Sequence, residues 1–161
     1  YDTGGISDVV FHRKPDFGHC FPDTRPGNEG GWIYVSNSEI RFPDPKNLAG
    51  VGALTFDAQG QLIDYRMLLE NSTANCAGGP TPWGTWVSCE EDREGRIWQV
   101  DPTGDREPEI LTVGLEQGFY EAFSADLRDP DQPIFFVTED RMRGTLWRWT
   151  PTNLSTWNGI Y

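Results

Sequence analysis

The stretch that decides the fold is "TWVSCEED", residues 85–92. It joins aromatic and β-branched residues, which are typical of strands, to three consecutive acids. Side chains alternate between the two faces of a strand, so Val87 and Cys89 share one face while Trp86 and Glu90 share the other. The stretch therefore predicts a buried strand whose end carries carboxylates.

The same pattern occurs at two other places in the chain. "WIYVSNSE" (32–39) and "FFVTED" (135–140) also lead through Val-Ser or Val-Thr to acids, and Val35, Val87 and Val137 lie 52 and 50 positions apart. Each of these first runs is followed by a second run that begins with Gly and ends in a tight turn. The second runs are "GALTFDAQG" (52–60), "GRIWQVDPTG" (95–104) and "GTLWRWTPTN" (144–153), and third runs follow at 61–70 and 107–116.

A period of about 50 residues with several strands per unit is the signature of a β-propeller. A sandwich would give similar strands, but it would give no reason for the period. We therefore predict an all-β fold, a partial β-propeller of about three blades of antiparallel strands, with the first runs as the inner strands. The chain would form one domain, 1–161, mostly loop over 1–30, with blades at 31–75, 76–118 and 119–161.

Two expectations about partners follow from this organisation. Propellers close with about four to eight blades, so another chain or a missing segment is expected to complete or cover this one. The formal net charge of −12 argues against binding nucleic acid, which needs clustered Lys and Arg. The sequence contains no transmembrane segment of about 18 apolar residues. Sequons at Asn71 and Asn153 favour an exported or organelle-lumenal protein.

The acids at the strand ends predict a metal site. Equivalent ends of inner strands converge on one mouth of a propeller channel, and Ca²⁺ takes six to eight oxygen ligands, largely from carboxylates and carbonyls. The candidate ligands are Glu39, Glu90, Glu91, Glu121, Glu139 and Asp140. The alternative is that these acids are solvated turn residues.

The three cysteines leave a second question open. Cys89 beside Glu90 would be a mixed soft and hard ligand pair, which suits iron better than calcium alone. A disulfide between Cys76 and Cys89 across a Gly/Pro-rich turn is also feasible. The odd number of cysteines, with Cys20 as the third, leaves at least one free thiol.

The stretch "NCAGGPTPWGTWVSCEED" (75–92) strongly resembles the signature of the PhoX family of alkaline phosphatases. "VSNSE", "GFYEAFSADL" and "FFVTEDRMRGTLWRWTP" resemble further elements of that family in the same order, over about residues 30–151. The family has His where this chain has Ser38 and Tyr120. Family members are longer, so the chain resembles one portion of them.

The resemblance implies a β-propeller phosphatase that acts on phosphomonoesters with calcium and iron in the channel mouth. Carried over by motif position, Cys89 would be an iron ligand, and Glu39, Glu90, Glu121 and Glu139 would be metal ligands, joined by Glu91 and Asp140. The alternative function is a non-catalytic, propeller-derived structural or binding subunit of a larger assembly.

Overall fold

The computed structural model describes residues 11–43, 45–46, 48–111, 113 and 117–150. This part of the chain contains eleven strands and no helix, so it holds no helix that could cross a membrane. The strands form three antiparallel sheets that follow one another along the chain. The fold is therefore all-β, as the sequence predicts, and three sheets agree with the three repeats.

The first sheet has four strands in the order β1-β2-β3-β4. They are β1 (Pro15–Pro22), β2 (Trp32–Ser38), β3 (Gly50–Phe56) and β4 (Leu62–Leu69). β3 and β4 are joined by the predicted "DAQG" turn, in which the N–H of Gly60 donates to the carbonyl of Asp57 at 3.0 Å. β1 lies in the segment 1–30 that we expected to be mostly loop.

The second sheet also has four strands, in the order β5-β6-β7-β8. They are β5 (Asn75–Pro80), β6 (Trp86–Glu90), β7 (Ile97–Val100) and β8 (Glu109–Ile110). The third sheet has the order β11-β10-β9, with β9 (Tyr120–Asp126), β10 (Ile134–Glu139) and β11 (Leu146–Trp149).

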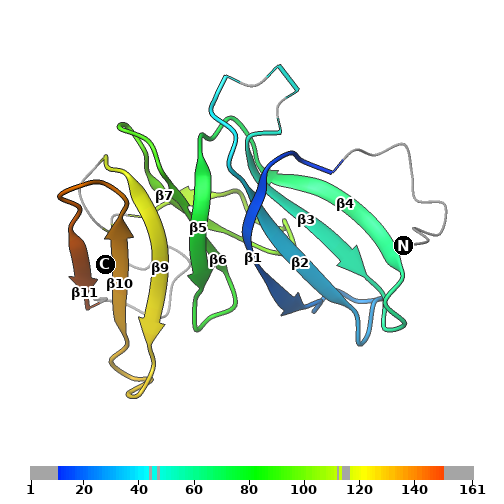
Figure 1. Ribbon diagram of the computed structural model, residues 1–161. Helices are drawn as coiled ribbons and strands as arrows, with labels where there is room; N and C mark the ends of the chain where they lie inside the picture. The colour runs from blue at the N-terminus through cyan, green and yellow to red at the C-terminus, as the bar shows by residue number, and fades with distance from the viewer. Residues whose placement is uncertain (1–10, 44, 47, 112, 114–116, 151–161) are drawn as a thin grey trace.

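The sheet orders correct one expectation. The first runs correspond to β2, β6 and β10, and each is the second strand of its sheet rather than the inner one. The inner positions belong to β1, β5 and β9, because β5 contacts both β1 and β9 (Figure 1). These strands escape a sequence search because "PDFGHCFP" and "NCAGGP" contain the Gly and Pro that usually mark turns.

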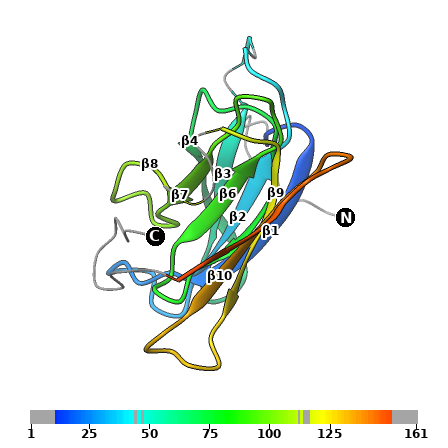
Figure 2. The same cartoon turned by 90° about the vertical axis from the view of Figure 1, so that its left-hand side faces the viewer.

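Two hydrophobic clusters hold neighbouring sheets together. Figure 2 shows the same strands from the side. Trp86 of β6 packs with Ile33 and Val35 of the first sheet. Val87 and Cys89, on the opposite face of β6, pack with the third sheet. β6 is thus buried on both faces, and the strand alternation predicted from "TWVSCEED" is confirmed.

Candidate metal centre

The first strand of every sheet contains a β-bulge at the same place. Each bulge sets two residues of the first strand against one residue of the second strand. The bulged pairs are Asp16–Phe17 in β1, Cys76–Ala77 in β5 and Glu121–Ala122 in β9, which lie opposite Asn37, Cys89 and Thr138 respectively. A bulge bends its strand and re-aims the side chains it carries, and such bulges are common beside active sites.

The bulges bring one polar side chain from each sheet together. The Sγ atom of Cys76 lies 3.2 Å from Oδ2 of Asp16 and 3.2 Å from Oε1 of Glu121. Both distances allow the thiol to donate a hydrogen bond to a carboxylate. Three sheets therefore meet at the Cys76 thiol.

A second set of acids follows the second strands. Glu39, Glu91 and Asp140 come directly after β2, β6 and β10. Each donates its backbone N–H, at 2.8–3.0 Å, to the carbonyl of the residue that precedes the first strand of the same sheet. The three acceptors are Lys14, Ala74 and Phe119. These three acids thus occupy equivalent positions at one end of the three sheets.

Together the two sets form a strand-end cluster, which consists of Asp16, Glu39, Cys76, Glu91, Glu121 and Asp140. Within it, one ligand atom each from Cys76, Glu91 and Glu121 lie within 4.8 Å of one another, a spacing that could hold a metal ion. Partial burial raises the pKa of Glu91, and the charges of Glu121, Asp140 and Glu39 raise it further. The structure thus brings Glu91 and Glu121, which come from two of the repeats, close together, and metal binding by the predicted set stays a prediction.

The electrostatics of this cluster favour a cation. Burial raises the pKa of the Cys76 thiol well above its ordinary value, and hydrogen bonds to Glu121 and Asp16 raise it further. The Oε2 atom of Glu121 is buried and has no hydrogen-bond partner among the described residues. An added positive charge would offset the repulsion between these carboxylates and would supply a partner for that oxygen.

Two of the predicted ligands, Glu90 and Glu139, accept hydrogen bonds from the turns that follow their strands. Glu90 is buried, and its carboxylate accepts hydrogen bonds from Ser72 and from the N–H groups of Thr73 and Arg96. Glu139 occupies the equivalent position in the third sheet.

The carboxylate of Glu139 likewise accepts from the backbone N–H six residues on, that of Thr145, at 2.9 Å, and it pairs with Arg141 at 2.8 Å. Both acids thus brace the turn that follows their strand, and their role as metal ligands stays a prediction.

Cys89 lies opposite the bulge that carries Cys76. Burial raises the pKa of its thiol, and the charges of Glu121 and Glu90 raise it further. Its side chain is fully buried in the core between the second and third sheets, beside Val87, Ile97 and Val137. All three cysteines of the chain are free thiols, so the Cys76–Cys89 disulfide is absent. The structure brings Cys76 rather than Cys89 to the carboxylates, and an iron-binding role for Cys89 stays a prediction.

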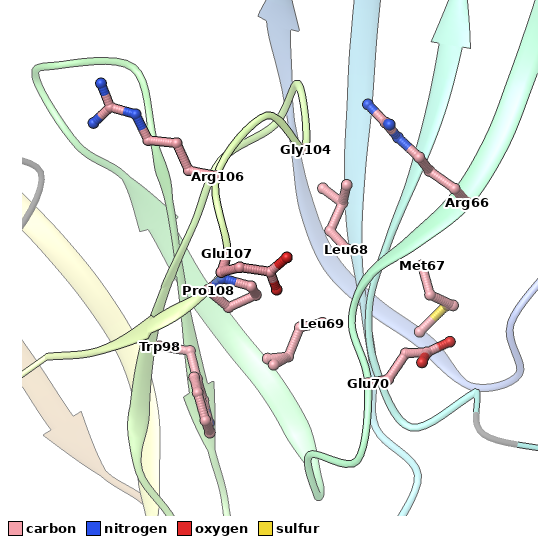
Figure 3. A pocket seen from close by; sticks show the side chains of 10 residues that line it. All are labelled: Arg66, Met67, Leu68, Leu69, Glu70, Trp98, Gly104, Arg106, Glu107 and Pro108. Atoms are coloured by element: carbon pink, nitrogen blue, oxygen red, sulfur yellow. The ribbon is translucent and has the colours of Figure 1, made fainter.

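Among the hollows that the described residues form, two differ in how they lie relative to the strand-end cluster. One, of about 500 Å³, begins one residue beyond the cluster on β5 and β9, at Ala77 and Ala122, and is walled by apolar side chains that include Phe17 and Phe123. The other, of about 450 Å³, lies between β4 and the β7–β8 region and includes Trp98 (Figure 3). None of the strand-end cluster lines this second hollow.

Comparison with known proteins identifies the family. The sequence model of the family described as "Alkaline phosphatase PhoX" matches residues 27–123, which is more than half of the chain. The chain belongs to the PhoX alkaline phosphatase family. No curated protein and no solved structure matches the chain.

The PhoX match contains four of the six residues of the strand-end cluster, Glu39, Cys76, Glu91 and Glu121, while Asp16 and Asp140 lie outside it. Ser38 and Tyr120, the two positions at which the family resemblance leads us to expect His, are both buried. Ser38 donates from Oγ to the carbonyl of Arg13 at 3.0 Å. Tyr120 packs in the core between the second and third sheets.

Sequence reasoning missed Asp16 and the position of Cys76. Asp16 lies in a segment without an obvious strand pattern. Asp16, Cys76 and Glu121 are each the second residue of a first strand. They precede Val35, Val87 and Val137 of the first runs by 19, 11 and 16 positions, so their spacing in the sequence does not align them.

Proposed function

We propose that the strand-end cluster binds metal and that this PhoX chain contributes part of the site of a phosphomonoesterase. The observation that carries the proposal is the meeting of Asp16, Cys76 and Glu121 from identical bulges in three sheets. Like charges repel, so the two carboxylates that meet at the Cys76 thiol, with Glu91 nearby, favour a compensating cation. The membership in a family of alkaline phosphatases supports the same reaction class.

The donor set suits the metals that we expected from the resemblance. Carboxylate oxygens from Glu39, Glu91, Glu121 and Asp140 are hard ligands of the kind that calcium prefers. The Cys76 thiol is a soft ligand that suits iron, provided that it gives up its proton. We propose calcium and iron as the cofactors, with Cys76, Glu91 and Glu121 as the central ligands.

A metal at this position would supply positive charge that stabilises the phosphoryl oxygens of a substrate. The residues of the chain supply the rest of the arrangement. The three bulges hold the ligands in place, and Arg41 brings a positive charge to the same edge, where it pairs with Asp92 and partly offsets the rise in the pKa of Glu91 that burial and the neighbouring acids cause. The apolar hollow at Ala77 and Ala122 offers a surface for the organic part of a phosphomonoester.

We further propose that another chain or segment completes or covers the sheets. The third sheet is the smallest, and both Leu146 of its edge strand β11 and Met142 in the preceding turn are exposed. An exported or organelle-lumenal site of action remains our expectation for the protein.

The test is metal analysis of the purified protein together with turnover of p-nitrophenyl phosphate. Bound iron or calcium and turnover at alkaline pH are the expected results, and both should be lost in the variant Glu121→Gln. Asp131→Asn, the same carboxylate-to-amide change at an exposed position between β9 and β10, is the matched control and should leave both intact. Metal-free protein that hydrolyses nothing after incubation with Ca²⁺ and iron would contradict the proposal.

A further inference from the structure

The side chain of Asn37 joins the first sheet to the second. Asn37 lies in β2 and is fully buried. Its Nδ2 atom donates to the carbonyl of Cys76 at 2.9 Å and to the carbonyl of Ala77 at 3.0 Å. Its Oδ1 atom accepts from the indole Nε1 of Trp86 at 2.9 Å. All three of these side-chain hydrogen bonds are therefore made to residues of the second sheet.

The two carbonyls that Asn37 binds belong to the β5 bulge. Cys76 and Ala77 lie between the paired residues Asn75 and Gly78, where the register against β6 shifts. A bulge disrupts the regular ladder of strand hydrogen bonds at this point. Buried carbonyls left without donors would be costly, and the Asn37 amide supplies a donor to both.

We propose that Asn37 is a positioning residue, which holds the β5 bulge in the conformation that directs the Cys76 thiol toward Asp16 and Glu121. Asn37 bonds to the carbonyls of Cys76 and Ala77, so it acts on the thiol through the backbone of β5. The consequence for metal binding rests on the proposed function, whereas the effect on the thiol itself does not.

The equivalent positions in the other two sheets support a specific role. Cys89 and Thr138 lie opposite the bulges of β5 and β9 as Asn37 lies opposite that of β1. Neither of these side chains has an NH₂ group with two donors. The contact of one amide with two bulge carbonyls therefore occurs where the first sheet packs against the bulge that carries Cys76. It is not a general requirement of the repeat.

The three cysteines of the chain provide a metal-free test. Cys20 is exposed, Cys76 is 8% exposed and Cys89 is fully buried. Alkylation of the metal-free protein by iodoacetamide, followed by mass spectrometry of its peptides, gives a rate for each. The rate at Cys20 measures the activity of the reagent. The rate at Cys76 measures how often the bulge opens, and the rate at Cys89 measures how often the core opens.

Asn37→Ala is expected to raise the alkylation rate of Cys76 by about tenfold or more relative to Cys89, because loss of buried hydrogen bonds favours local opening. Asn37→Asp keeps the shape and the acceptor for Trp86 but replaces the two-donor group, and should act in the same direction. Gln99→Leu is the control: Gln99 is also fully buried and bonded to Trp83 and Thr85 at the other end of the sheet. It should leave the ratio of the two rates unchanged.

An unchanged ratio of Cys76 to Cys89 rates in both Asn37 variants would overturn the proposal, and so would a parallel rise of both rates. The second arm measures Ca²⁺ and iron binding, which both Asn37 variants should weaken by about tenfold or more while Gln99→Leu does not. A wild-type protein that binds neither metal would refute the proposed function alone, because the alkylation ratio would still decide the role of Asn37.

Discussion

The Sγ atom of Cys76 lies 3.2 Å from Oε1 of Glu121, although 45 positions separate the two residues in the chain. Cys76 belongs to the second sheet and Glu121 to the third. The contact therefore depends on how these sheets pack, and on the bulges that aim both side chains. We therefore expect substitutions of the metal-site residues and substitutions of residues packed between the sheets to have separable effects on metal binding and on stability.

Exchanging each buried cysteine for serine separates the site from the core. Cys76→Ser should lower the affinity for iron by more than about 100-fold, because loss of an outer-shell partner alone costs about 10–100-fold. Cys89→Ser should keep that affinity but lower the free energy of unfolding by about 1–3 kcal/mol, because it buries a hydroxyl in an apolar core. Metal titration and urea denaturation measure the two effects. A loss of iron affinity in Cys89→Ser alone would restore the assignment that the sequence suggested.

Removing the charge of Glu91 should stabilise the metal-free protein. Its pKa is raised in the fold, so the folded state retains a proton that the unfolded state releases, and stability falls as the pH rises from the unfolded pKa through the folded one. Glu91→Gln should therefore raise the melting temperature at pH 7 in the presence of chelator, and the gain should vanish below about pH 4.

The same Glu91→Gln variant should bind metal less tightly than the wild type, so its advantage in stability should reverse when metal is added. A variant that is less stable than the wild type at pH 7 without metal would contradict the repulsion that we infer. Glu94→Gln, an exposed neighbour in the same turn, is the control and should change neither quantity.

Glycine at position 79 is needed for the close approach of β5 to β9. A methyl group at Gly79 would collide with the backbone carbonyl of Phe123. Gly79→Ala should therefore cost about 1–3 kcal/mol of unfolding free energy, as overpacking does elsewhere. It should also weaken metal binding, because it separates the strands that carry Cys76 and Glu121. Stability equal to that of the wild type would show that the two strands can move apart freely.

Buried His12 should make the protein less stable in mild acid. Burial lowers the pKa of His12 to about 4, and its ring nitrogens contact Tyr65 and Ser36. As the pH falls below about 6.5, the unfolded state gains a proton that the folded state does not accept until about pH 4.

The resulting loss of stability across this window is at most about 3 kcal/mol. The difference between the pH profiles of the wild type and His12→Gln, followed by urea denaturation, isolates this contribution because the other titrating groups cancel. Parallel profiles from pH 7 to pH 4 would show that His12 titrates normally.

Much of the fold follows from local patterns in the sequence. The strands β2, β6 and β10 are predictable because aromatic and β-branched residues alternate and then give way to acids. The "DPTG" turn is predictable because it ends in a glycine, which readily adopts a positive φ, and Gly104 has a φ of 67° in the structure. These features are encoded by neighbouring residues.

The inner strands and the choice of cysteine could not be derived in the same way. β5 is a strand because Gly78 and Gly79 let it pack tightly against β6 and β9, which is a tertiary effect that its sequence "NCAGGP" hides. In the sequence Cys89 directly precedes three acids, whereas Cys76 has no acid beside it. The bulge nevertheless turns Cys76 toward the acids and leaves Cys89 in the core.

The repeated bulge separates the chemistry of the site from the architecture that supports it. Because the same backbone shape presents Asp16, Cys76 and Glu121, a single codon change at any of these positions alters the hardness of the donor atom while the strand pairing is preserved. Replacing the Cys76 thiol by a carboxylate would leave only oxygen donors at these three positions. Metal preference in such a scaffold can therefore drift between lineages, or be redesigned, one sheet at a time.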